Sequence, residues 1–142
     1  MIPFGFLMII NYRGKIVVFG SPIEGDDDTV KAVKSAIAMQ KKAIEIDKNL
    51  HKKNGLRLKI GIGISTGKVF SGILGSLRIK EFTSIGMPVN IASRLQSMAK
   101  GGEILISETT HKKFGRELDV EILPPAVVKG VSEPIRVYRV KL

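Results

Sequence analysis

The chain has 142 residues, of which 44% are hydrophobic and 25% charged, a composition typical of one globular domain and not of a disordered chain. The absence of cysteine excludes disulfides, thiolate metal sites and a cysteine nucleophile, and it is compatible with a reducing compartment such as the cytoplasm. The net charge of +10 favours anionic partners, among them nucleotides, nucleic acids and acidic membrane surfaces.

The first twenty residues predict two strands. Residues 1–10 are apolar but lack the basic segment and cleavage site of a signal peptide, and no apolar run reaches the ~20 residues that span a bilayer. A turn around Asn11-Tyr12-Arg13-Gly14 separates this strand from residues 16–19. The second segment is a continuous apolar run, which predicts a central strand covered on both faces.

A long helix is predicted at about residues 29–50, ended by Asn54-Gly55. Its apolar face carries Val30, Val33, Ala36, Ile37 and Ile44. The aspartates at positions 26–28 are interpreted as cap and dipole partners of the helix start, with a metal site as the alternative.

Residues 58–65 alternate apolar side chains with Lys, Gly, Gly and Ser, which predicts a strand that is flat on one face. Such a face suits the close approach of another backbone or of a ligand. We expect Thr66-Gly67-Lys68 to form a turn, residues 69–74 to return as the second arm of a hairpin, and residues 79–85 to form another strand.

A helix is predicted at residues 89–98, with Pro88 in its first turn and Gly101-Gly102 after its end. Asn90 and Arg94 are four residues apart and therefore share one face of this helix. The remaining elements are a strand at 103–107, a short helix at 108–115, and strands at 120–123 and 135–140.

Common catalytic motifs are missing from this sequence. The residues around Lys68 match neither a phosphate-binding loop, since positions 62 and 69 are Ile and Val, nor a dinucleotide fingerprint, since position 66 is Thr. His51 and His111 each lie among lysines and are interpreted as exposed residues, not as ligands. The many lysines are interpreted as a solvated face, because no basic and aromatic residues interleave as in nucleic-acid binders.

Five segments, in order and in register, resemble the catalytic domain of class III nucleotidyl cyclases, the adenylate and guanylate cyclases. They are VVFGSP at 17–22, TVKAVKSAIAMQ at 29–40, LKIGIGISTGKVFSGILGS at 58–76, EFTSIGMPVNIASRLQSMAKGGEILIS at 81–107 and VKGVSEPIRVYRV at 128–140. The resemblance covers about nine-tenths of the chain. It implies a ferredoxin-like α/β (α+β) fold, in which helices pack on a sheet, and a dimer with active sites between the subunits.

The resemblance also implies a reaction and its residues. Family members convert ATP or GTP to a cyclic nucleotide and pyrophosphate in signal transduction, using two Mg²⁺ or Mn²⁺ ions held by two aspartates. Asn90 and Arg94 stand at the positions that orient the ribose and stabilise the transition state. Lys129 stands at the triphosphate-binding position, and Thr83 at the base-selecting position, where threonine favours ATP over GTP.

The N-terminal part departs from the family pattern. The first strand and two helices are missing, and with them one metal-binding aspartate. The Gly-Asp pair that carries the other falls on Tyr12-Arg13, and the base-selecting lysine falls on Ile9. True loss of these residues and a displaced reading frame both account for this mismatch. We therefore expect the chain to bind no metal by itself, because an arginine without carboxylates has the wrong charge.

These features lead to a cytoplasmic cyclase-homology domain, spanning residues 1–142, that is inactive as a homodimer and needs a partner domain to supply the aspartates. A non-enzymatic dimerisation or regulatory nucleotide-binding module is the alternative. A basic nucleic-acid binder is a third hypothesis, which we do not expect.

Overall fold

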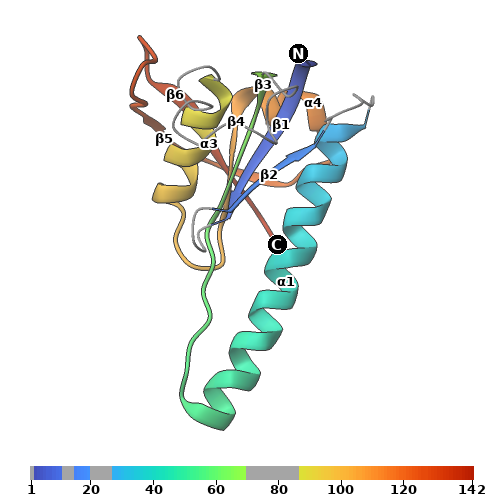
Figure 1. Ribbon diagram of the computed structural model, residues 1–142, viewed down its shortest axis with the longest axis vertical. Coiled ribbons are helices and arrows are strands. Elements are labelled where there is room, and N and C mark those ends of the chain that lie inside the picture. The colour runs from blue at the N-terminus through green and yellow to red at the C-terminus, as the bar shows by residue number, and fades with distance from the viewer. Residues whose placement is uncertain (1, 11–14, 20–26, 70–86) are drawn as a thin grey trace.

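The computed structural model describes residues 2–10, 15–19, 27–69 and 87–142, which form one sheet with helices on both faces (Figure 1). The strands are β1 (Ile2–Ile10), β2 (Lys15–Phe19), β3 (Ile62–Val69), β4 (Ile104–Ser107), β5 (Val120–Ala126) and β6 (Ile135–Val140). The helices are α1 (Asp28–Asn54), α3 (Met87–Met98) and α4 (Glu108–Phe114).

Within these residues the six strands follow the order β2-β1-β3-β4-β6-β5. β3 and β4 are parallel neighbours joined through α3, and the other neighbouring pairs are antiparallel. The predicted mixed α/β fold is confirmed, as are the strand pair at the N-terminus, the short helix α4 and the C-terminal strands.

The two faces of the sheet carry separate hydrophobic clusters, because neighbouring side chains of a strand point to opposite sides. Ile104 and Ile106 of β4 pack with α1 and the end of α4 on one face. Leu105, between them, packs with Leu95 of α3 on the other face. α3 therefore lies alone on its face among the described helices, and this placement leaves its outer side free for a site.

The flat face of β3 lies directly under α3. A Cβ atom added to Gly63 would overlap the carbonyl oxygen of Ala92 and the backbone nitrogen of Gln96. The glycine alternation predicted close approach by a backbone or by a ligand, and the structure shows that the backbone of α3 makes this approach.

The predicted turn at Thr66-Gly67-Lys68 is wrong, because β3 continues through these residues to Val69 and pairs with β1. Thr66 is buried and shares a hydrogen bond of 2.9 Å with the hydroxyl of Thr110, while Gly67 lies against Pro88. These contacts with distant residues hold the glycine and its neighbours in an extended strand. The predicted strands at 69–74 and 79–85 fall almost wholly on residues 70–86, outside the described residues.

The prediction of a central strand at residues 16–19 is also wrong. This segment is β2, an edge strand that pairs only with β1 among the described strands. Val17 is 37% exposed, whereas Phe19 packs against the core beneath α1. An apolar run does not distinguish a strand covered on both faces from an edge strand that is covered on one.

Helix α1 is confirmed and continues four residues further than predicted, to a left-handed Gly55 with φ of 70°. The cap interpretation is only partly confirmed. Asp27 occupies the N-cap position without a side-chain cap hydrogen bond, and it forms an ion pair of 3.3 Å with Lys31 instead. Asp28 is buried in the first turn, and Asp26 lies outside the described residues.

Two polar residues on the buried face of α1 were not predicted. The amide nitrogen of Gln40 donates hydrogen bonds of 2.8 Å to the carbonyl of Ile60 and 2.9 Å to that of Glu103. Asp47 accepts a hydrogen bond of 2.7 Å from the backbone N–H of Leu58. Through these hydrogen bonds both side chains tie the helix to the segment that leads into β3.

Asp47 should make the free energy of unfolding depend on pH in the acidic range. The Leu58 N–H lowers the pKa of its carboxyl, burial opposes this effect, and Lys59 and Arg57 lower the pKa further. A lowered folded-state pKa stabilises the protein above the unfolded pKa of about 3.9, and this contribution disappears as the pH falls through the folded-state value. We expect Asp47→Asn to lower the melting temperature at pH 7 and to have little effect near pH 2.

The matched control for Asp47→Asn is Asp119→Asn, since Asp119 is exposed and pairs with Lys141 at 3.7 Å. An exposed pair of this kind contributes little. A difference between wild type and Asp47→Asn that stayed constant from pH 7 to pH 2 would contradict the role given to this carboxylate.

Candidate nucleotide site

Helix α3 presents an apolar face to the sheet and a polar face to the solvent. Ala92 and Leu95 are fully buried, as expected for residues three apart on the inner side. The outer side carries Asn90, Ser93, Arg94 and Ser97, which follow the i, i+3, i+4, i+7 spacing of one helical face. Arg94 is exposed, and its backbone carbonyl accepts a hydrogen bond of 2.8 Å from the hydroxyl of Ser97.

A turn between β5 and β6 faces this polar side. The N–H of Val131 donates a hydrogen bond of 3.1 Å to the carbonyl of Val128, and Gly130 has a φ of 85°. Val128 is 3% exposed and anchors the turn, whereas Lys129 at its corner is exposed. The turn therefore holds a lysine beside α3 although the two segments are far apart in the sequence.

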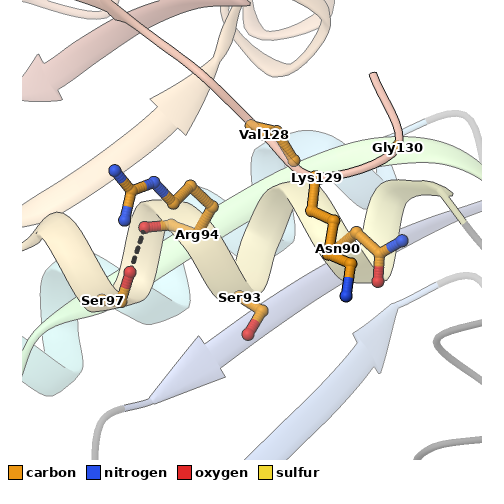
Figure 2. Close-up of a pocket in the computed structure, with 7 residues that line it drawn as sticks. All are labelled: Asn90, Ser93, Arg94, Ser97, Val128, Lys129 and Gly130. Carbon is orange, nitrogen blue, oxygen red and sulfur yellow. Dashed lines mark hydrogen bonds between the residues drawn. The ribbon is translucent and has the colours of Figure 1, made fainter. Parts of the chain in front are cut away.

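Together α3 and the turn form an open pocket of about 620 Å³ (Figure 2). Its lining consists of Asn90, Ser93, Arg94, Ser97, Val128, Lys129 and Gly130. Figure 2 shows the Lys129 side chain running from the turn toward Asn90, and the Arg94 guanidinium pointing away along the helix. The pocket thus offers an amide, hydroxyls and two cations from two directions.

The electrostatics of the pocket suit an anion. Arg94 and Lys129 are its charged lining residues, and neither has an ion-pair partner within the described part of the chain. A guanidinium fork and an ammonium group both bind phosphate oxygens. Within residues 2–10, 15–19, 27–69 and 87–142, no carboxylate lines the pocket, and no group of three or more His, Cys, Asp or Glu side chains is placed to bind a metal ion.

The structure brings three of the four predicted site residues together: Asn90, Arg94 and Lys129. Thr83 lies outside the described residues. Ser93 and Ser97 were missed, although their spacing from Asn90 on a predicted helix was a usable signal. The lining role of Gly130 had no such signal, because it depends on how the last two strands are placed against α3.

Comparison with known proteins decides the family. A family model described as the adenylate and guanylate cyclase catalytic domain matches residues 14–141. The chain belongs to this family. The pocket between α3 and the turn is therefore a pocket of a nucleotidyl cyclase domain.

Individual cyclases agree with this assignment. The chain is 32% identical over 125 residues to an adenylate cyclase of Anabaena cylindrica, and 33% identical over 119 residues to the terminal-differentiation specific adenylate cyclase of Dictyostelium discoideum. These alignments cover 82% and 78% of the chain. They cover only 25% and 5% of the two relatives, so the chain spans a small part of either protein.

The fold of the cyclase domain is shared as well. The adenylyl cyclase CyaB from P. aeruginosa superposes with a TM-score of 0.73 at 29% sequence identity, covering 95% of this chain and 71% of that structure. The described residues of the chain include no helix that is long and apolar enough to cross a membrane.

Proposed function

We propose that this cyclase domain binds a nucleoside triphosphate, ATP in preference to GTP, in the pocket between α3 and the turn, and takes part in its conversion to cyclic nucleotide and pyrophosphate. The observation that carries the proposal is the meeting of Asn90, Arg94 and Lys129 in one pocket. Arg94 and Lys129 are exposed cations without a carboxylate partner among the described residues, so an anion bound in the pocket would meet positive charge from both α3 and the turn.

Each residue has a chemical role in this proposal. The Arg94 guanidinium stabilises the charge that develops on the α-phosphate when the ribose 3′-hydroxyl attacks it, because a planar fork of donors matches phosphoryl oxygens. Asn90 orients the ribose through its side-chain amide, which can both donate and accept hydrogen bonds. Lys129 neutralises the triphosphate as a point charge.

The metal ions used by cyclases do not fit the side chains of this pocket. A divalent cation placed there would face Arg94 and Lys129 and would find no carboxylate among the described lining residues. We propose that the carboxylates needed for the reaction come from a partner cyclase domain, and that a homodimer of this chain makes no cyclic nucleotide. The proposed setting is a cytoplasmic dimer with the nucleotide between its subunits.

Binding of ATP to the isolated protein tests the proposed site. We expect a dissociation constant on the order of 0.1–1 mM, because charge complementarity is present without bridging metal ions. The double variant Arg94→Ala/Lys129→Ala should bind at least about tenfold more weakly, a change of about 1.4 kcal/mol. Calorimetry or ligand-observed NMR measures both constants, and rising salt should weaken the wild-type binding.

A charge-matched control separates the site from general electrostatics. Lys48→Ala/Lys52→Ala also removes two positive charges, from exposed positions in the C-terminal half of α1. This control should bind ATP like the wild type. Equal affinity of the wild type and the Arg94→Ala/Lys129→Ala variant would mean that the pocket residues are only a solvated polar face.

A further inference from the structure

Gly130, which lines the pocket, has a left-handed backbone conformation. Its φ of 85° lies in the region that residues with a side chain rarely adopt, and it is the third residue of the turn closed by the hydrogen bond from Val131 to Val128. Turns of this kind need glycine or asparagine at that position. The requirement is local and is set by the turn.

Steric crowding does not explain why position 130 is a glycine. A Cβ added to Gly130 would have only the terminal methyl of Met87 nearby, at 3.7 Å, which is ordinary van der Waals contact. Gly63 differs, since an added Cβ there would overlap the backbone of α3. A substitution at Gly130 would therefore be accommodated by changing the turn, not by moving the helix.

The consequence of such a change falls on Lys129. This residue occupies the other corner of the same turn, next to the peptide bond that would rotate if φ at Gly130 became negative. Val128 before it is held in the core at 3% exposure, so the change cannot spread in that direction. The Lys129 side chain, which now runs toward Asn90 (Figure 2), would take a new direction.

We infer that Gly130 is a positioning residue for the triphosphate: its positive φ aims Lys129 into the pocket. The inference rests on the proposed function and deepens it, because it assigns the anion affinity of the pocket to the geometry of the turn as well as to the charge of the lysine. Gly130 itself contributes no side chain to the ligand.

The ATP affinities of Gly130→Val, Gly130→Asn and Lys129→Ala test the inference. Gly130→Val should weaken binding by about as much as Lys129→Ala, roughly three- to tenfold, because a β-branched residue cannot keep a positive φ. Gly130→Asn should restore affinity to within about twofold of the wild type, since asparagine tolerates this conformation. If Gly130→Val did not fold, Gly130→Ala would take its place.

Gly55→Val is the matched control. Gly55 also has a positive φ, of 70°, and open space around it, but it does not line the pocket. It caps the C-terminal end of α1, which lies apart from α3 (Figure 1). The Gly55→Val substitution should lower the melting temperature and leave the affinity for ATP unchanged. This control separates loss of positioning from a general loss of stability.

The outcomes distinguish the inference from the proposed function. Wild-type affinity in Gly130→Val, together with weak binding by Lys129→Ala, would overturn the inference and leave the proposed function standing. An equal loss in Gly130→Val and Gly130→Asn would also overturn it, because a tolerated φ would then bring no rescue. Wild-type affinity in Lys129→Ala would remove Lys129 from the proposed function, and the inference would fall with it.

Discussion

Replacing Gly63 by alanine should lower the free energy of unfolding by about 3 kcal/mol, the upper part of the range for overpacked cores. The added methyl group would overlap the carbonyl of Ala92 and the backbone nitrogen of Gln96. Backbone atoms within a helix cannot rotate away as a side chain can. Relief therefore requires all of α3 to move from the sheet, which gives up packing at Leu95.

Gly61→Ala should cause a smaller loss of stability than Gly63→Ala. Its Cβ would lie 2.9 Å from the carbonyl oxygen of Ala99 and 3.0 Å from its Cβ, beyond the C-terminal end of α3. A small shift of this end relieves the contact, so we expect a loss of about 1 kcal/mol. Urea denaturation followed by circular dichroism measures both variants. Equal losses would show that α3 is not held rigidly against β3.

Gly63→Ala should also change the nucleotide site, because Gly63 contacts the buried face of α3. Asn90 and Arg94 lie on the outer face of α3, so a displaced helix carries both away from Lys129. Gly63→Ala should therefore weaken ATP binding although Gly63 does not line the pocket. Preserved affinity with lost stability would mean that the helix moves without changing the site.

The second large effect concerns catalysis. With ATP and Mg²⁺ or Mn²⁺, the protein alone should form no cyclic AMP above background. Mixed with a cyclase domain that has its own carboxylates but lacks its own asparagine and arginine, it should restore product formation. Arg94→Ala should then lower the rate by about 10²–10³, the usual cost of removing a group that stabilises transition-state charge.

Lys100→Ala is the control for this experiment, because Lys100 is an exposed cation just after α3 that does not line the pocket. It should leave the restored activity unchanged. Clear turnover by the chain alone, abolished by Arg94→Ala, would contradict the proposal that a partner supplies the carboxylates. Restored activity that survived Arg94→Ala would contradict the role of Arg94.

The local features of this protein follow from the sequence alone. Apolar spacing predicted α1 and α3, and the flat alternation around Gly63 predicted close approach to a strand. That strand was predicted to begin at residue 58, whereas the observed β3 begins at Ile62. Gly55 was expected to end α1 and does so in a left-handed conformation. These predictions succeed because periodicity, caps and glycine conformations are set by neighbours in the chain. The cyclase motifs added Asn90, Arg94 and Lys129 as candidates.

The tertiary structure decided what depends on distant partners. Thr66 and Gly67 have the composition of a turn, yet pairing with β1 and packing on Pro88 keep them in β3. Gln40 has the polarity of a surface residue, yet it is fully buried, and its amide nitrogen donates hydrogen bonds to the carbonyls of Ile60 and Glu103, just before β3 and β4. Gly130 is a further example. Its positive φ is a local property of the turn, but the turn places Lys129 in the pocket only because it packs beside α3.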